Sequence, residues 1–235
     1  MFKIINPSNI FLIATKAINH LTYLFIVLIF LGLLYSLFIS PVDYIQGHSV
    51  RIMYVHVPSS WISIGCFAFI GLASIINFIY KNKNFSLFGK SLAPLGLMFA
   101  IISIVTGALW GQPTWGTWWA WDARLTSMLV LGIFYLSYIL SWKFISDFSL
   151  SSKVSSIIAI VGLINLPVIK YSVDWWATLH QTSTIKIVSN STIHFSMMLP
   201  LMVMFFALLT FSGLIFLMKY KTEIIKMNNK GLDRL

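Results

Sequence analysis

Long apolar runs separated by short polar connections dominate this sequence. Five runs contain no Asp, Glu, Lys or Arg over 18 or more residues: 21–39, 59–80, 91–110, 125–142 and 193–218. A helix needs about 20 apolar residues to cross the hydrocarbon core of a bilayer. Each run therefore predicts one membrane-spanning helix.

A sixth, shorter run at 154–169 contains Asn165 and Pro167, and Lys153 and Lys170 flank it. The distribution of basic residues supports counting this run as a span. Twelve of the 16 Lys and Arg residues fall before the first run, after the last run, or in alternate connections between runs. Because basic residues accumulate on the cytoplasmic side of a membrane, both termini are predicted to be cytoplasmic, which requires an even number of spans.

These runs predict an all-α polytopic membrane protein, a single six-span domain covering residues 1–235. With 58% hydrophobic and 9% charged residues, the chain is too apolar for a water-soluble domain. Its net charge of +10 is explained by a lysine-rich cytoplasmic side attracted to the anionic headgroups of a lipid bilayer, so we expect no nucleic-acid partner. The first run exceeds the core of a signal peptide, and we expect it to be retained.

The chain lacks the sequence signals of several chemistries. Its single cysteine, Cys66, permits neither an internal disulfide nor a Cys-x-x-Cys-His site for covalent haem attachment. No phosphate-binding loop motif occurs between the runs, so we expect no nucleotide hydrolysis by this chain. A binding or transfer function is favoured over an enzymatic one.

The unusual residues gather in three connections that face outward in this topology: 40–58, 111–124 and 170–192. Five of the nine tryptophans lie at or inside the second connection: Trp110, Trp115, Trp118, Trp119 and Trp121. One interpretation is an aromatic belt, because tryptophan is enriched where a membrane meets water. A belt does not require the two glycines and the aspartate among these tryptophans. The other interpretation is a surface for a large flat ligand that is apolar at its centre and charged at one edge, such as haem.

Neighbouring residues suit such a ligand. Gly111 and Gly116 permit close turns of the backbone, and Arg124 is placed to pair with a propionate. Asp122 has two interpretations of equal weight, as a site residue or as the N-cap of the helix that begins near residue 125.

Two histidines, His56 and His180, flank the tryptophan-rich connection on the outward side. Each alone is more often an interfacial hydrogen-bonding residue, but two neutral imidazoles together would complete a six-coordinate haem iron. Pro58 suits the first turn of the second span and would hold His56 at the membrane surface. If the segment around His180 is helical, Val173 and Trp176 share its face.

The remaining histidines have weaker cases. His194 begins the last run and is a reserve candidate for an iron ligand, whereas His48 is expected to be an exposed loop residue. His20 lies on the cytoplasmic side of the first run.

The tryptophan-rich connection carries a known signature. Residues 115–122 read Trp-Gly-x-Trp-Trp-x-Trp-Asp, and the chain resembles the haem-handling membrane proteins that share this pattern. The continuation at 123–127, Ala-Arg-Leu-Thr-Ser, is similar to the short members, the cytochrome c maturation protein C or haem exporter protein C type. The segments 43–58, 165–169 and 171–181 resemble the same family.

The resemblance implies a function and a site. It implies that haem is bound without a covalent bond, as a b-type haem, at the outer face of the membrane, and is delivered to a membrane-anchored haem chaperone during c-type cytochrome biogenesis. The implied iron ligands are His56 and His180. The further binding residues are Trp115, Trp118, Trp119, Trp121, Asp122, Arg124, Arg51, Trp176 and Gln181.

The resemblance also implies partners and a location. The partners are the chaperone, the subunits of an ATP-binding cassette transporter and a small membrane subunit. The membrane is the bacterial inner (cytoplasmic) membrane or, alternatively, the mitochondrial inner membrane.

Two other functions stay open at this point. The first is a transporter that moves haem through its own six spans, although no charged residue marks a polar path inside any span. The second is a b-type electron-transfer cytochrome subunit, which would also use two histidines. That alternative predicts a pair buried within the spans, whereas the sequence places both histidines at the outer boundary.

Overall fold

The computed structural model describes residues 7–180 and 193–229, and the regular elements in this part of the chain are all helices, with no strand. Two short helices, the π-helix η2 and the 3-10 helix η3, accompany seven α-helices. The elements are α1 Pro7–Leu34, η2 Tyr35–Ile39, η3 His48–Ile52, α2 Met53–Tyr80, α3 Lys83–Trp115, α4 Ala123–Phe144, α5 Phe148–Gly162, α6 Asn165–Trp175 and α7 Phe195–Asn229.

Six helical segments of the described chain are long and apolar enough to cross a membrane. They are Phe11–Ile39, His48–Tyr80, Lys83–Trp115, Ala123–Phe144, Phe148–Trp175 and Phe195–Met227. The predicted class, an all-α polytopic membrane protein, is confirmed. The side of the membrane on which each terminus lies stays a prediction.

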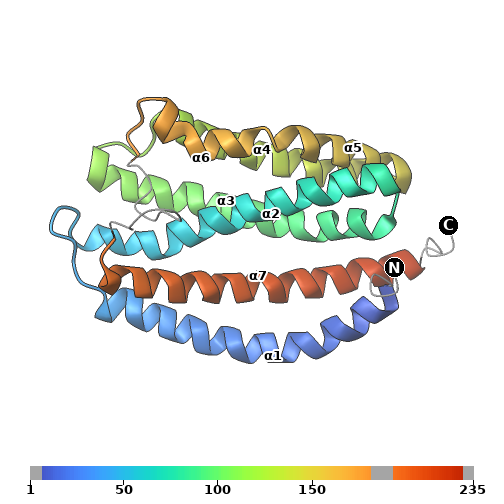
Figure 1. Ribbon diagram of the computed structural model, residues 1–235, viewed down its shortest axis with the longest axis horizontal. Coiled ribbons are helices and arrows are strands. Elements are labelled where there is room, and N and C mark those ends of the chain that lie inside the picture. The colour runs from blue at the N-terminus through green and yellow to red at the C-terminus, as the bar shows by residue number, and fades with distance from the viewer. Residues whose placement is uncertain (1–6, 181–192, 230–235) are drawn as a thin grey trace.

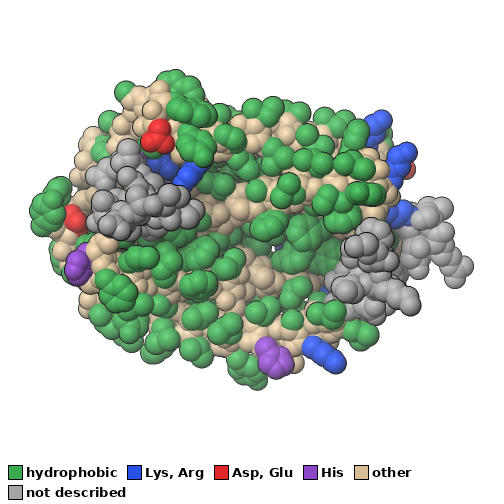
Figure 2. Space-filling model, in the orientation of Figure 1, with side chains coloured by type: hydrophobic (Ala, Val, Ile, Leu, Met, Phe, Trp, Pro, Cys, Tyr) green, Lys and Arg blue, Asp and Glu red, His purple; other side chains and the backbone are tan. Residues whose placement is uncertain are grey.

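The helices lie side by side along the long axis of the molecule (Figure 1). α1 packs against α7, α2 packs against α3, and α4 contacts α3, α5 and α6. α1 begins and α7 ends at the same end of the bundle, and Lys and Arg side chains gather there while hydrophobic side chains cover the middle (Figure 2). This separation matches the charge asymmetry of the sequence.

The shortest predicted span, 154–169, is part of a longer, interrupted helix. α5 ends at Gly162 and α6 begins at Asn165, so the two together extend over Phe148–Trp175. Pro167 lies in the first turn of α6, where its missing N–H removes no helical hydrogen bond. The Asn165 side chain donates to the carbonyl oxygen of Ser127 on α4 at 2.8 Å, which satisfies a polar group inside the bundle.

Buried side chains of α2, α3 and α4 hold the centre of the bundle together. Phe67, Phe99, Leu131 and Tyr135 are almost fully buried in one core cluster. The hydroxyl of Tyr135 donates to the carbonyl oxygen of Ser63 on α2 at 2.6 Å, so even this buried polar atom is satisfied. The relative positions of the three helices that carry most of the candidate site are therefore set by close packing.

Two of the predicted outward connections are shorter than expected. The connection 40–58 already becomes helical at His48, so Pro58 lies inside α2 and not at its first turn. The connection 111–124 starts late, because α3 continues to Trp115 and ends at Gly116. Gly116 has φ +74°, and its N–H donates to the carbonyl oxygen of Gln112, as is common for a glycine that ends a helix.

Candidate functional site

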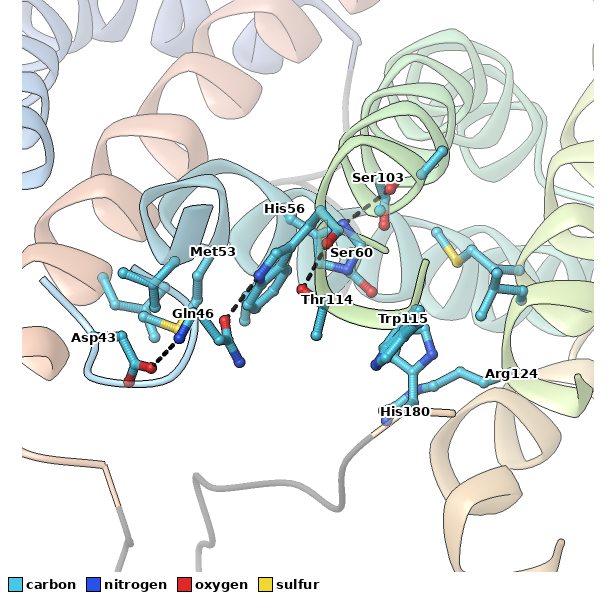
Figure 3. Close-up of a pocket in the computed structure, with 18 of the residues that line it drawn as sticks. Asp43, Gln46, Met53, His56, Ser60, Ser103, Thr114, Trp115, Arg124 and His180 are labelled. Atoms are coloured by element: carbon cyan, nitrogen blue, oxygen red, sulfur yellow. Dashed lines mark hydrogen bonds between the residues drawn. The ribbon is translucent and has the colours of Figure 1, made fainter. Parts of the chain in front are cut away.

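A cavity of about 610 Å³ (Figure 3) is lined by residues from the end of the bundle opposite the two chain termini. α2, α3 and α4 line it together with the connection after η2 and the residues around 193–201. Five residues predicted for the site lie along its wall: His56, Trp115, Trp119, Arg124 and His180. Its volume falls in the range of about 300–1,000 Å³ that is typical of small-molecule and cofactor sites.

His56 lies one turn inside α2, so its predicted place in a loop before the helix is wrong. Its Nδ1 is 2.9 Å from the carbonyl oxygen of Ser103 and 3.2 Å from Thr106 Oγ1, both on α3. A carbonyl oxygen only accepts hydrogen bonds, so Nδ1 carries the ring proton and donates it. Nε2 is therefore left with an unshared electron pair.

The ring of His56 fits a space that α3 leaves open. A Cβ atom at Gly107 would lie 2.9 Å from His56 Cε1, so any larger residue there would displace the ring. Trp110 meets the ring edge to face at a centroid distance of 5.8 Å. The Trp110 Nε1–H donates to Gln46 Oε1 at 2.9 Å, which ties the turn after η2 to α3.

His180 lies beyond α6, in a bend of the chain. α6 ends at Trp175 and Trp176 is extended, so the helical face predicted for Val173, Trp176 and His180 does not form. The His180 ring lies 4.8 Å from the ring of Trp115, centroid to centroid, at an angle of 57° (Figure 3). Two chain segments far apart in sequence thus bring His180 and the end of α3 together.

The electrostatic surroundings keep the His180 ring neutral. Burial, followed by the positive charge of Arg124, lowers the pKa of His180 to about 4. Its Nδ1 is buried and has no hydrogen-bond partner among the described residues. The nearest carboxylate oxygen, Asp122 Oδ2, is 3.9 Å away, which is too far for a hydrogen bond.

Asp122 is the N-cap that one of its two interpretations predicted; it does not line the cavity, and its role in the site stays a prediction. Oδ1 accepts from the backbone N–H of Leu125 at 2.8 Å, so the residue is the N-cap of α4. Oδ2 accepts from the backbone N–H of Leu179 at 3.3 Å and faces His180. One side chain therefore starts a helix and positions the segment that carries a candidate ligand.

The four tryptophans predicted as a platform divide into two pairs. Trp115 and Trp119 line the cavity, and the indole Nε1 of Trp119 is buried without an acceptor among the described residues. Trp118 and Trp121 do not line it, and 59% and 78% of their surfaces are exposed.

Three further predicted site residues lie away from the cavity or outside the described chain. Trp176 is about half exposed and packs against Trp175. Arg51 lies in η3, and its Nε is buried without a partner among the described residues, but it does not line the cavity. Gln181 lies outside the described residues.

His194 also lines this cavity and is an exposed residue. Its Nδ1 accepts the backbone N–H of Ser196 at 3.3 Å and lies 2.8 Å from the Ser196 hydroxyl. Because a backbone N–H only donates, the ring proton is on Nε2. This tautomer is the reverse of that of His56 and offers a donor to the cavity, not an electron pair.

Several lining residues were missed by the sequence prediction. Gln46 and Trp110 belong to segments that were recognised as unusual, so those segments provided a signal. Ser103 and Gly107 lie within an apolar run, and nothing in that run marks them. Their importance comes from facing His56 across two helices.

The lining fits a flat ligand that brings its own metal. No group of three or more His, Cys, Asp or Glu side chains that could hold a bare metal ion occurs in the described part of the chain. His56 and His180 are neutral ligands of the kind that bind the free positions of haem iron. Arg124 places a cation in the wall, as a ligand with a carboxylate edge would need, and the Trp119 Nε1–H is a donor without a partner among the described residues.

Comparison with known proteins gives one consistent result. The family described as Heme exporter protein C matches residues 1–234. Heme exporter protein C of Bradyrhizobium diazoefficiens is 34% identical over 235 residues, which cover 100% of this chain and 89% of the relative. Heme exporter protein C of Escherichia coli K12 is 38% identical over 224 residues, 95% of this chain and 90% of the relative.

A plant protein is similar over a shorter stretch. A ccmC-like mitochondrial protein of cytochrome c biosynthesis from Marchantia polymorpha is 40% identical over 190 residues, which cover 81% of this chain and 80% of that protein. Since the family match extends over nearly every residue and the relatives align along most of their own length, the chain belongs to the heme exporter protein C family.

Proposed function

We propose that this chain binds haem without a covalent bond in the 610 Å³ cavity, with His56 and His180 as axial ligands, and delivers it to a membrane-anchored chaperone in cytochrome c biogenesis. The observation that carries the proposal is that these two histidines, 124 positions apart in the sequence, line one cavity. His56 comes from α2, and His180 comes from the connection after α6.

The hydrogen bonding of His56 supports its role as a ligand. Histidines that bind metals usually donate their other ring N–H to a carbonyl or carboxylate oxygen, which fixes the tautomer and the ring orientation. The Nδ1–H of His56 donates to the Ser103 carbonyl oxygen, so Nε2 is the atom that faces an iron. The ring is in this tautomer before any ligand arrives.

His180 has the same type of arrangement in a looser form. Asp122 Oδ2 is 3.9 Å from its Nδ1, and a small movement of the ring would bring the two within hydrogen-bonding distance. A carboxylate that accepts from the ring N–H of a ligand increases the basicity of that ligand. His180 lacks the ring hydrogen bond that holds His56, and a less firmly held ligand suits a protein that must release the haem it binds.

The relatives' names and the charge distribution support the setting. Proteins called heme exporter protein C and a mitochondrial protein of cytochrome c biosynthesis are similar over most of this chain, which places it in haem handling for c-type cytochromes. The cavity lies opposite the lysine-rich end, which by the positive-inside rule supports a position at the outer face of a bacterial inner membrane or mitochondrial inner membrane. A transporter complex and a small membrane subunit would be the further partners.

The exposed aromatic residues suggest how a chaperone reaches the haem. Trp118 and Trp121 expose 59% and 78% of their surfaces beside the cavity-lining Trp119. Exposed tryptophan is enriched at the centres of protein interfaces. We assign these two side chains to contact with the chaperone and Trp115 and Trp119 to contact with the porphyrin.

The haem absorption spectrum of the purified chain tests ligation. The wild-type chain is expected to show a six-coordinate spectrum, and His56→Ala and His180→Ala are each expected to lose it and to retain roughly tenfold less haem. His48→Ala is the matched control, because His48 is exposed and does not line the cavity. An unchanged spectrum in either ligand variant would remove that residue from the proposal.

Delivery requires a separate measurement. The membrane-anchored chaperone is produced with and without this chain, and the haem attached covalently to the chaperone is quantified after denaturing electrophoresis. Attached haem is expected to depend on the chain and to fall in both ligand variants. Equal attachment in the absence of the chain would refute delivery while leaving haem binding intact.

A further inference from the structure

A second cavity, of about 370 Å³, lies at the opposite end of the bundle between α3, α4 and α7. Lys90, on its wall, is separated from Gly107 beside His56 by about 25 Å of α3, at 1.5 Å per residue. The two cavities are therefore distinct sites. This one lies at the end where Lys and Arg side chains gather (Figure 2).

The wall of this cavity carries an excess of positive charge. Four lysines line it, Lys90 from α3, Lys143 from α4, and Lys219 and Lys226 from α7, against one carboxylate, Glu223. Four ammonium groups and one carboxylate leave a local excess of three positive charges. No other acidic residue lines the cavity.

The single carboxylate on this wall, that of Glu223, already pairs with two of the four lysines. Glu223 Oε2 lies 2.6 Å from Lys90 Nζ, and Glu223 Oε1 lies 3.1 Å from Lys226 Nζ. No carboxylate in the described part of the chain lies within ion-pair distance of Lys143 or Lys219. These two ammonium groups, from two helices that both pack against α3, are the ones left to neutralise an anion.

The cavity also lies at the depth of the lipid headgroups. Lys143 is next to the last residue of α4, and Trp142 beside it lines the cavity with its ring 5.1 Å from Lys90 Nζ. Tryptophan at the end of a span marks the boundary between headgroups and acyl chains. Phe144 and Met218, the chain neighbours of the two unpaired lysines, expose 76% and 49% of their surfaces.

We infer that this cavity binds the phosphate of an anionic phospholipid, with Lys143 and Lys219 as its cations and the acyl chains against the exposed apolar side chains beside them. Basic pockets between spans on the cytoplasmic side of membrane proteins bind headgroups of this kind. A lipid is favoured over free phosphate because the basic wall adjoins exposed apolar side chains that acyl chains would cover and free phosphate would not. The inference does not rest on haem binding.

Lipid binding by the purified full-length chain in a neutral detergent tests the inference. Native mass spectrometry measures the affinity for phosphatidylglycerol, for phosphatidylcholine and for inorganic phosphate. Phosphatidylglycerol is expected to bind well above the other two. The double variant Lys143→Gln, Lys219→Gln is expected to bind it roughly 30-fold more weakly, because each lysine near an anionic lipid contributes about a fivefold factor.

The control carries the same loss of charge at another place. Lys16→Gln, Lys153→Gln removes two exposed lysines that do not line the cavity, and it is expected to bind phosphatidylglycerol as the wild type does. An equal loss in this control would show a diffuse surface charge effect and overturn the inference. Equal binding of phosphatidylcholine, or binding of inorganic phosphate at the same affinity, would overturn it as well.

A variant that is expected to bind the lipid more tightly separates the effect of charge from an effect of misfolding. Glu223→Gln keeps the shape of the side chain and removes the only carboxylate on this wall, so phosphatidylglycerol is expected to bind about fivefold more tightly. A gain of affinity cannot come from a loss of fold. Unchanged or weaker binding in this variant would contradict a site governed by the charge of this wall.

Discussion

The Nδ1–H of His56 donates to the carbonyl oxygen of Ser103 at 2.9 Å, and this bond between α2 and α3 fixes which ring nitrogen faces the cavity. Thr106 supports the same bond, because its hydroxyl donates to the carbonyl oxygen of Ile102 and so accepts from His56. The backbone of α3 thus orients the imidazole without any side-chain carboxylate. The orientation of this imidazole therefore depends on how closely the two helices approach.

The closeness of that approach is tested at Gly107. Gly107→Ala adds a Cβ that would lie 2.9 Å from His56 Cε1, so the ring must shift and its bond to Ser103 weakens. We expect roughly tenfold weaker haem binding, measured by titration of the purified chain. Gly132→Ala is the matched control, because no atom lies within 4 Å of its added Cβ. Equal losses in both variants would point to a general effect on the helices.

The two functions of Asp122 are separable by substitution. Asn is as good an N-cap as Asp, so Asp122→Asn is expected to keep the thermal stability of the chain while weakening haem binding, because the charge facing His180 is lost. Asp122→Ala is expected to lower the stability by about 1 kcal/mol as well. Melting curves and haem titrations of the two variants measure the difference. Wild-type haem binding by Asp122→Asn would confine this residue to capping.

The spans were predictable from sequence because length and lack of charge suffice to identify them. Six apolar runs correspond to six helical segments, including the weak run that the distribution of lysines supported. The helix ends were less predictable. In the segments around His48 and Trp110 the helices continue past the apolar runs, since few charged residues interrupt them and interfacial residues are equally compatible with a helical turn.

Only part of the candidate site was predictable: five of the eleven predicted residues line the cavity, and their conformations were not predictable. His56, His180, Trp115, Trp119 and Arg124 all line the cavity. The division between lining and exposed tryptophans depends on where α3 ends, at a glycine with positive φ, and that end is set by local backbone geometry. The tautomer of His56 depends on a carbonyl of another helix, which no sequence pattern marks.

The pH dependence of haem binding follows from the neutral state of His180. Its pKa is lowered to about 4, below the usual value of 6.5, so the ring stays unprotonated at neutral pH. Protons compete with a haem iron for the ring nitrogen only in acid. Since the depressed pKa means that the unfolded chain binds a proton that the folded chain does not, the stability of the folded chain also falls as the pH drops from about 6.5 toward 4. Haem binding is expected to be constant from pH 8 to about pH 5 and to decline near pH 4. A decline centred near pH 6.5, measured by absorption, would contradict this assignment.

Arg124 is expected to set the position of that decline. Its positive charge is the second cause of the low pKa of His180, after burial, so Arg124→Gln should move the pKa upward. The pH at which haem is half released should therefore rise, in addition to a loss of affinity from the missing partner of a propionate. Lys170→Gln, which removes an exposed cation that does not line the cavity, should leave the midpoint unchanged. A lower affinity without a shift of the midpoint would confine Arg124 to contact with the ligand.

The two classes of tryptophan should respond differently to truncation. Trp119→Ala removes a cavity-lining ring and a buried donor, so haem retention is expected to fall roughly tenfold, in line with about 1.4 kcal/mol for a lost aromatic contact. Trp118→Ala removes a side chain that is 59% exposed and does not line the cavity, and it is expected to retain haem as the wild type does. The same Trp118 variant should transfer less haem to the chaperone, because exposed tryptophans contribute strongly to interfaces. The absorption of the purified chain and the haem attached to the chaperone measure the two effects separately. Loss of haem from the Trp118 variant before any chaperone is added would contradict this division and place the side chain against the porphyrin. The tryptophan segment would then have to move toward the cavity when haem binds.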